Sequence, residues 1–368
     1  MNKKRYPEFH EKLLRWFDAH QRDLPWRKDY SPYAVWISEI MLQQTQVKTV
    51  LPFFERWMER FPDLSRVALA SHDEILKCWE GLGYYTRAKN IHQAAQTIVR
   101  EHGGEFPREH RTLLKLPGIG QYTAGAVMSL AFGQDYAAVD GNVERVLARV
   151  FNVAAPINET ATRSFFRKTA RDLIPAGEGR RFNQGLMELG ALVCAPRNPH
   201  CPTCPVVELC ESHRLGIVDQ RPVRSKRNPA VPVEAAVGAL IHEGRMLIQK
   251  RPPTGLMADL WEFPGGKTRN GETPEEALVR ELREELELEI RCLDKIAVIR
   301  HSYTSFRVTL HAFFCAFQGP PRTPVLRAAS EARWVTAEQL DDYAFPAANR
   351  RLITLLKKSS EWTRSPEP

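Results

Sequence analysis

The sequence predicts two dissimilar folded parts in one chain, an all-α part followed by an α+β part. The chain has 368 residues, which is more than one ordinary domain holds. Apolar residues recur at helical spacing up to about residue 212, for instance between Val35 and Phe61, and no strand-like alternation stands out there. After about residue 232, short apolar runs alternate with turn residues, as is typical of strands.

Proline and glycine divide the first part into separate helices. The spacing predicts helices near residues 84–102, 122–132, 140–151, 161–174 and 181–194. Residues 213–232 hold prolines, arginines and few apolar side chains, so we expect an extended linker whose arginines either touch phosphate or are simply solvated. In the second part we expect a β-hairpin with its turn at Glu243–Gly244, then one helix and three strands; the expected segments are 234–241, 245–251, 274–287, 291–300, 305–317 and 331–335.

The charge is basic overall but uneven along the chain. Lys and Arg outnumber Asp and Glu by 52 to 44, which gives a net charge of +8. Residues 272–289 contain eight acids and two bases, so the rest of the chain carries +14, which favours a polyanionic partner. No segment approaches the ~18 consecutive apolar residues of a membrane helix, and the first residues do not resemble a secretory signal. We therefore expect a cytoplasmic protein with no membrane partner.

Four of the seven cysteines are crowded into one short stretch, with the spacing Cys194-x6-Cys201-x2-Cys204-x5-Cys210. Without an export signal, a disulfide framework is not expected. Zinc ribbons usually have two CxxC knuckles and only one is present, so the spacing favours an iron–sulfur cluster over zinc, with chance as the third alternative. We expect the other three, Cys78, Cys292 and Cys315, to be small buried hydrophobes.

A glycine-containing turn, Leu116-Pro117-Gly118-Ile119-Gly120, lies between two helix-like segments. Glycine permits a positive φ and a close backbone approach, and the free N–H groups that open the next helix can hold a phosphate. The pattern is that of a helix–hairpin–helix, whose carbonyls can also bind a cation. The alternative is an ordinary turn between helices.

Asp140, about twenty residues after this turn, stands where a helix is expected to begin. Its simplest role is an N-cap, worth about 1 kcal/mol. Its functional role would be an ionised carboxylate beside a developing cation, which a helix N-terminus favours.

Several segments in this order resemble the adenine DNA glycosylases, within the helix–hairpin–helix superfamily that includes endonuclease III. They are LPWR (24–27), SEIMLQQTQV (38–47), GLGYYTRAKN (81–90), LPGIGQYTAGAV (116–127), VDGNVERV (139–146), the cysteine loop and a Nudix-like C-terminal region.

The resemblance implies an all-α helix–hairpin–helix glycosylase fold with a [4Fe-4S] loop, joined to an α+β Nudix-like domain. The expected boundaries are a helical region over 1–212, a linker over 213–232, a Nudix-like domain over 233–358 and a tail over 359–368. Within the helical region, a six-helix barrel covers about 26–132 with the helix–hairpin–helix at 111–130, and 1–25 with 133–212 form the iron–sulfur domain.

The resemblance also implies base excision repair, in which adenine opposite 8-oxoguanine or guanine is flipped out of the duplex and removed. Glu39 matches the general acid that protonates the base, although its helical spacing with Gln43 and Gln46 alone indicates a solvated carboxylate. Asp140 matches the carboxylate that stabilises the sugar cation, Asn142 orients that site, and Tyr122 is the hydrogen-bonding neighbour.

Tyr122 stands where bifunctional relatives carry a nucleophilic lysine. Tyrosine has no amine, and the nearest lysine in the sequence is Lys115, before the hairpin. We therefore expect base removal without efficient strand cleavage.

Other matched residues fall into groups around the substrate and the cofactor. The resemblance assigns the adenine pocket to Trp26, Arg27, Leu42, Val47 and Gln184, duplex contacts to Gln44, Thr45, Leu82, Tyr84, Gly118, Gly120 and Gln121, and the cluster to Cys194, Cys201, Cys204 and Cys210. Plain core packing is the alternative for Leu42, Val47 and Leu82.

The loop expected to recognise 8-oxoguanine, residues 301–305, departs from a Phe-Ser-His loop in relatives. Tyr303 can still wedge and Thr304 can still donate a hydrogen bond, but Ser305 does not replace an imidazole.

Residues 266–288 form a Nudix box with one departure, Glu287 in place of a glycine. We expect this change to remove a left-handed helix cap. Either the box acids are a relic on a solvated helix, or they still bind Mg²⁺ and hydrolyse a nucleoside triphosphate.

The leading hypothesis is a monofunctional adenine glycosylase, a monomer whose partner is duplex DNA with A:8-oxoguanine or A:G mispairs, acting in the cytoplasm at a bacterial nucleoid. The alternatives are an endonuclease III-like enzyme for oxidised pyrimidines, a nucleotide hydrolase formed by residues 233–358, and a non-catalytic DNA-binding protein.

Overall fold

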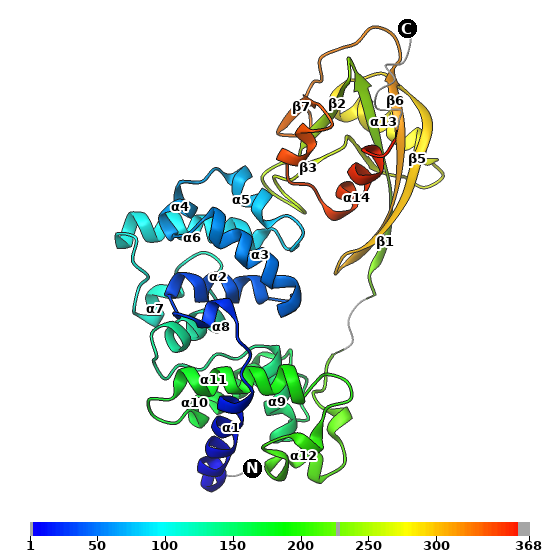
Figure 1. Ribbon diagram of the computed structural model, residues 1–368. Helices are drawn as coiled ribbons and strands as arrows, with labels where there is room; N and C mark the ends of the chain where they lie inside the picture. Colours follow the sequence, from blue (N-terminus) through cyan, green and yellow to red (C-terminus); the bar gives the residue numbers. More distant parts are fainter. Residues whose placement is uncertain (1–2, 226–228, 360–368) are drawn as a thin grey trace. The chain divides into compact units, whose positions relative to one another are not determined.

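The computed structural model describes residues 3–225 and 229–359 (Figure 1). The chain forms two compact units, one of residues 1–69 with 90–227 and the other of residues 70–89 with 228–368. Of the expected tail, only Ser359 lies within the described residues. None of the helices in the described segments combines the length and apolar character that crossing a membrane requires.

The first unit is helical, and its described residues contain no strand. The apolar pattern from Val35 to Phe61 divides into two helices around the turn Gln43–Gln46. The helices are α1 (Tyr6–His20), α2 (Pro32–Leu42), α3 (Val47–Arg60), α4 (Leu64–Leu69), most of α6 (Thr86–His102), α7 (His110–Leu113), α8 (Gln121–Ala126), α9 (Gly141–Val150), α10 (Thr160–Leu173), α11 (Gly179–Glu188) and α12 (Glu211–Arg214).

One apolar core joins the start of the chain to helices far along it. Phe9 and Leu13 of α1 are fully buried against Val146 of α9 and Phe182 and Leu186 of α11. This packing fixes α9 and α11, the two helices that carry Asp140 and Gln184. Burial of a side chain of this size stabilises a fold by about 1.5–3 kcal/mol.

The expectation of an extended linker over 213–232 is wrong for its first half. Arg149, buried on α9, donates hydrogen bonds from Nε to the carbonyls of Val218 (3.2 Å) and Arg221 (3.0 Å). The Ile157 amide donates to the carbonyl of Val223 at 3.0 Å. A buried arginine needs acceptors, and the backbone of this proline-rich segment supplies them, so the segment is fixed on the first unit.

The second unit contains a mixed sheet, and the expected hairpin, helix and strands are all confirmed. The strand order is β3-β2-β1-β6-β5, with β4 paired to β1 and β7 to β2; only β1 and β6 pair in parallel within the described residues. The elements are α5 (His72–Trp79), β1 (Val231–His242), β2 (Arg245–Lys250), β3 (Trp261–Glu262), β4 (Gly265–Lys267), α13 (Pro274–Leu286), β5 (Ile290–Ser302), β6 (Phe306–Phe317), β7 (Glu331–Val335) and α14 (Ala347–Leu356).

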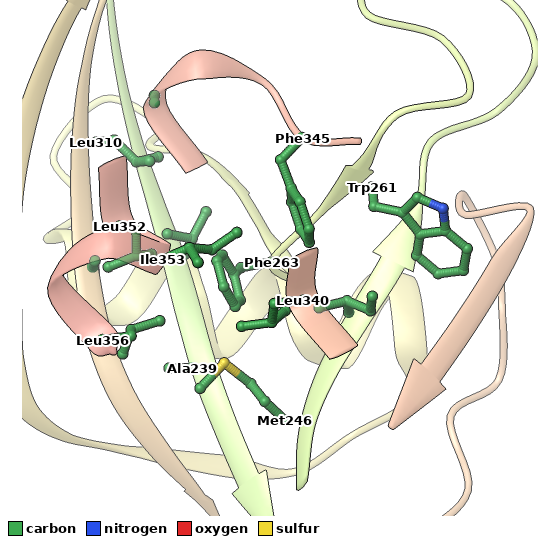
Figure 2. Packing of buried hydrophobic residues seen from close by; sticks show 14 of the residues in the cluster. Ala239, Met246, Trp261, Phe263, Leu310, Leu340, Phe345, Leu352, Ile353 and Leu356 are labelled. Atoms are coloured by element: carbon green, nitrogen blue, oxygen red, sulfur yellow. The ribbon is translucent and has the colours of Figure 1, made fainter. Parts of the chain in front are cut away.

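Both faces of the sheet are covered, which explains why β1 reads as a continuous apolar run. Ala239 faces a core that includes Phe263 and Phe345 and is closed by Leu352 and Leu356 of α14 (Figure 2). The alternate residues Ala236 and Leu240 face a second core closed by Leu278, Leu282 and Leu286 of α13.

Residues 70–89 are tied to this unit by a partly buried ion pair. Glu80 accepts hydrogen bonds from Arg350 Nη2 (2.8 Å) and from the Phe345 amide (2.8 Å). Because Glu80 binds both a guanidinium and a backbone amide, this contact has a defined geometry.

Candidate active site

One cavity of about 950 Å³ in the first unit gathers many of the residues predicted to handle the flipped base. It is formed by the turn Pro25–Arg27, α2, the turn after it, α8, and the ends of α9 and α11. The predicted residues that line it are Trp26, Arg27, Glu39, Leu42, Gln44, Thr45, Val47, Tyr122, Asp140, Asn142 and Gln184.

Glu39 is buried, with 3% of its surface exposed, so the solvated carboxylate that its helical spacing indicates is wrong. Helix α2 is buried on every side, and periodicity therefore does not separate an inner from an outer face. Tyr122 Oη donates a short hydrogen bond to Glu39 Oε2. Burial raises the pKa of Glu39 to about 7, a shift that the Tyr122 bond and the more distant Arg27 oppose and the Asp140 charge assists.

Asp140 is the N-cap of α9, as expected. Its Oδ1 accepts the backbone amides of Asn142 (2.9 Å) and Val143 (2.8 Å), and its Oδ2 accepts the Asn142 side chain (2.8 Å). Burial raises the pKa of Asp140, and these hydrogen bonds oppose the shift because each favours the ionised form. The carboxylate is therefore held in one orientation at the cavity wall.

Arg145 connects this carboxylate site to the cysteine loop, a role that the sequence did not indicate. Its Nη2 donates to Asn142 Oδ1 at 2.8 Å and to the Gly190 carbonyl at 2.7 Å. Its Nε donates to the Cys194 carbonyl at 2.8 Å.

An ion pair with Glu188, which also pairs with Arg22, holds Arg27 in place. Glu188, fully buried at the end of α11, contacts Arg27 Nη1 at 2.6 Å and Arg22 Nε at 2.8 Å. Sequence reasoning identified Arg27 but not Glu188 or Arg22, because Glu188 lies far along the chain, 166 residues after Arg22.

Gln184 is oriented by residues that sequence reasoning missed. Its Nε2 donates to Tyr30 Oη at 3.2 Å and to the Arg180 carbonyl at 3.3 Å. Because a carbonyl only accepts, the amide nitrogen must face Arg180. The Arg180 guanidinium lies over the Tyr30 ring, 4.5 Å from its centroid, and donates to the Leu130 carbonyl at 2.6 Å. The Gln184 carbonyl oxygen lies 3.4 Å from Tyr30 Oη, which can donate to it, and its second lone pair remains for a ligand.

The cavity rim also carries Lys48, which is exposed. Lys115, the lysine nearest to Tyr122 in the sequence, does not line the cavity. The distance along the sequence from the hairpin does not identify Lys48, because this residue belongs to the start of α3.

The four clustered cysteines line one small pocket whose walls are otherwise largely apolar. Arg149 Nη1 donates to Cys194 Sγ at 3.2 Å. Four sulfur donors in a dry pocket, with a cation hydrogen-bonded to one of them, match the donor set of an iron–sulfur cluster.

In the helix–hairpin–helix, Gly118 alone has a left-handed backbone, with φ of +74°. A Cβ on Gly118 would lie 2.6 Å from Cβ of Asn90, so a side chain does not fit there. Gly120 is extended instead, and Gln121 is the first residue of α8.

Two of the predicted duplex-contacting residues share an unusual backbone conformation. Gln44 and Tyr84 both have positive φ, +58° and +49°. Such conformations cost free energy in residues other than glycine and concentrate at binding sites. Leu82, by contrast, is 6% exposed and packs in the interior.

The predicted 8-oxoguanine loop lies between β5 and β6 of the second unit. Thr304 and Ser305 are exposed, and Thr304 Oγ1 forms a hydrogen bond with Tyr84 Oη. The Tyr303 ring stacks on Phe306 with centroids 4.6 Å apart.

Arg280 forms ion pairs with several acids of the Nudix box. Arg280 contacts Glu272 (2.6 Å), Glu281 (2.7 Å) and Glu284 (3.3 Å). The Arg280 guanidinium lowers the pKa of Glu272 to about 2. Within the described residues, no group of three or more His, Cys, Asp or Glu side chains is arranged to hold a metal ion, which applies to these acids and also to the four clustered cysteines.

The expected loss of the left-handed cap at Glu287 is wrong. Glu287 has φ of 55° and ψ of 31°, and its amide still bonds to the carbonyls of Leu282 and Arg283. Its side chain forms an ion pair with Arg327. The helix keeps its cap because hydrogen bonding and packing outweigh the strain of a non-glycine residue.

Comparisons with known proteins agree with this geometry. Residues 37–176 match the HhH-GPD superfamily of base excision DNA repair proteins, and residues 236–355 match the NUDIX domain. A thermostable thymine-DNA glycosylase covers 58% of this chain and 98% of its own, with 33% identity and a TM-score of 0.54. An endonuclease III in a non-covalent DNA complex covers 59% and 99%, with 25% identity and a TM-score of 0.51. The fold and cavity therefore define a helix–hairpin–helix DNA glycosylase fused to a Nudix-like domain.

The sequence relatives specify the branch of that class. The adenine DNA glycosylase of Rattus norvegicus is 34% identical over 96% of this chain and 79% of its own length. The chain belongs to the family of adenine DNA glycosylases and is an enzyme of that family. The endonuclease III-like alternative is not favoured, because the adenine branch matches both units and the endonuclease III structure matches 59% of the chain.

Proposed function

We propose that the enzyme removes adenine mispaired with 8-oxoguanine or guanine from duplex DNA, as a monomer and without cutting the strand. The observation that supports this most strongly is the pairing of two carboxyl groups, the buried Glu39 and the partly buried Asp140, in one cavity large enough for a purine. A duplex is the expected partner because the related endonuclease III structure is a DNA complex. We place the activity in the cytoplasm. The basic charge of +8 agrees with a nucleic-acid partner.

Glu39 acts first, as the general acid. Adenine leaves poorly as an anion, so its ring must take up a proton before the glycosidic bond breaks. With a pKa of about 7, Glu39 holds a proton near neutral pH and can still release it. Tyr122 holds the carboxyl toward the cavity through its hydrogen bond to Oε2.

Asp140 acts on the sugar cation that remains. Its three hydrogen bonds from Asn142 and Val143 fix a negative charge at the cavity wall before the reaction begins. Such preorganised charge is worth more in a water-poor site than in bulk water. A water molecule then adds to C1′ and gives the abasic sugar, and the proton that the water loses passes to a nearby proton acceptor.

Gln184 selects the base. Its Nε2 is committed to Tyr30 and Arg180, so its carbonyl oxygen accepts the exocyclic amine of adenine. A 6-oxo purine would bring another acceptor against that oxygen, and an unpaired buried acceptor is costly.

The second unit recognises the opposite base. Thr304 and Tyr84 form a hydrogen bond with each other. Their hydroxyl groups can bond to 8-oxoguanine, and the Tyr84 ring can wedge between the stacked bases. Tyr303 contributes less as a wedge, since its ring is stacked on Phe306. The arginine-bound Nudix acids favour the interpretation that the box is a relic.

Cys194, Cys201, Cys204 and Cys210 hold a [4Fe-4S] cluster in this proposal. When bound, the cluster would tie the loop together and supply no step of base removal. The helix–hairpin–helix turn at Gly118 and Gly120, with Gln121, would contact the phosphate backbone and bind a cation through its carbonyls.

The test uses the holoenzyme on duplexes that carry A opposite 8-oxoguanine, A opposite G, or thymine glycol. We expect strands with A:8-oxoguanine to break only after alkali, because an abasic site is left intact. Asp140→Asn should abolish the signal while gel-shift binding persists. Release of thymine glycol without adenine, or a fully active Asp140→Asn, would refute the proposal. Borohydride trapping with Lys48→Ala as control tests whether the rim lysine forms a Schiff base.

A further inference from the structure

Two cysteines of the second unit, Cys292 on β5 and Cys315 on β6, are direct cross-strand partners. The Gln318 amide donates to the Glu289 carbonyl at 2.8 Å, which marks that residue pair as hydrogen-bonded. Hydrogen-bonded and non-hydrogen-bonded pairs alternate along antiparallel strands, so the Cys292 and Cys315 pair is non-hydrogen-bonded. Such pairs have Cα atoms about 4.5 Å apart, within the range that a disulfide spans.

Their side chains lie on the same face of the sheet, in the core closed by α13. Cys315 is 2% exposed, and a Cβ on Gly238 of β1 would lie 2.9 Å from its sulfur. The Cys315 sulfur is therefore confined between β1 and α13, with little freedom to turn away. Cys292 is only half-buried, with its sulfur 3.7 Å from the Glu275 carbonyl.

The two thiols interact before any reaction. The neighbouring Cys315 thiol lowers the pKa of the Cys292 thiol, whereas Cys292 and burial raise the pKa of Cys315. The more accessible sulfur is thus also the better nucleophile.

We propose that Cys292 and Cys315 form a reversible intramolecular disulfide when a hydroperoxide reaches Cys292. The Cys292 thiolate attacks the peroxide and, with one proton, gives the sulfenic acid and an alcohol or water. The Cys315 thiol then displaces water from the sulfenic sulfur and forms the S–S bond. In total two thiols are oxidised, one hydroperoxide is reduced, and one water and one alcohol or second water leave. A cellular dithiol restores the reduced pair.

The cross-link would close the open end of the β5–β6 hairpin, whose other end carries residues 303–305. Its effect would be to restrain the two strands that support this loop, under the same oxidising conditions that produce 8-oxoguanine. The proposal stands on the cysteine geometry and does not depend on the proposed glycosylase role.

The test treats the full-length holoenzyme with hydrogen peroxide, blocks free thiols, digests without reductant and maps peptides by mass spectrometry. We expect one cross-linked peptide pair joining Cys292 to Cys315, lighter by two hydrogen atoms, which disappears after dithiothreitol. The oxidised protein should unfold at a temperature several degrees higher than the reduced protein.

Matched variants separate this pair from the other cysteines. Cys292→Ser should remove the cross-link and leave Cys315 reduced, whereas Cys315→Ala should leave Cys292 as the sulfenic or sulfinic acid. Cys78→Ser should keep the cross-link. Should Cys292 and Cys315 both stay reduced while the cluster cysteines oxidise, or should Cys292 pair with a different cysteine, the proposal is overturned.

Discussion

Carboxyl groups are concentrated in two regions of this protein, and the two regions treat them in opposite ways. In the cavity of the first unit, burial raises the pKa of Glu39 to about 7, with only a tyrosine hydrogen bond and a distant arginine opposing it. Just before the Nudix-box helix α13, direct contact with Arg280 lowers the pKa of Glu272 to about 2. The same residue type therefore holds a transferable proton in one unit and a permanent charge in the other. Local solvation and pairing, rather than residue identity, decide whether an acid can do chemistry.

The largest expected effect comes from removing the proton donor. Glu39→Gln keeps the size of the side chain but provides no acidic proton, so adenine release in single-turnover assays should slow by about 10²–10⁴-fold. Glu59→Gln, on the exposed side of α3, is the matched control and should leave the rate unchanged. A near-normal rate for Glu39→Gln would show that Glu39 does not donate the proton and would contradict the contrast between the two regions.

A smaller effect is expected from a neutral side chain of the same cavity. Tyr30→Phe removes one of the two acceptors that orient Gln184, so excision of adenine should slow by about tenfold relative to purine, which lacks the amine. Because the variant is compared with wild type on each base, the different leaving abilities of adenine and purine cancel when the two rate changes are divided. Tyr136→Phe, whose ring stacks on His110 outside the cavity, should not alter this ratio.

The pH dependence tests the origin of the Glu39 pKa. The active form is protonated, so the rate should fall as the pH rises above about 7. Tyr122→Phe removes the bond that lowers this pKa, and the alkaline limb of the pH–rate profile should move to higher pH. A limb that stays in place or moves to lower pH would show that Glu39 is not the titrating group.

The paired acids should affect stability rather than catalysis. Glu272 has a depressed pKa in the folded state, so its contribution is present above its unfolded pKa of about 4.3 and is lost as the pH falls through about 2. Arg280→Met should therefore lower the unfolding temperature at pH 7, with a difference from wild type that narrows below about pH 4. Arg291→Met is the control on the exposed side of β5. A difference that persists at the lowest pH would point to packing instead.

The smallest effect concerns the end of the same helix. Glu287→Gly relieves a left-handed backbone and should stabilise the protein by about 1 kcal/mol, less the weak Arg327 ion pair. Glu287→Ala loses the ion pair but keeps the strain, so it should not stabilise. Urea unfolding of the two variants gives the comparison.

Sequence patterns predicted what depends on local physics. The strands of the second unit, the cap at Asp140 and the positive φ of Gly118 follow from alternation, capping and turn chemistry. The burial of Glu39 does not, because α2 is apolar on every face and its environment comes from distant segments. Only the family resemblance identified that residue.

Contacts that span long sequence distances were also beyond pattern reasoning. Glu188 with Arg22, and Tyr30 with Gln184, join residues more than 150 positions apart. The segment after residue 213 reads as a linker because its composition is polar and rich in proline, yet its carbonyls satisfy buried Arg149. Such pairings depend on tertiary structure, which a window of neighbouring residues does not contain.

The roominess of the cavity has a thermodynamic consequence. At about 950 Å³ it admits water beside Glu39 and Asp140 until a base enters. A purine that displaces this water disfavours the ionised form of Glu39 further, whereas its hydrogen bonds keep Asp140 charged, so association with the substrate is coupled to proton uptake by Glu39 from the buffer. The heat measured by calorimetry will then vary with the ionisation enthalpy of the buffer, and affinity will weaken as the solution becomes more alkaline.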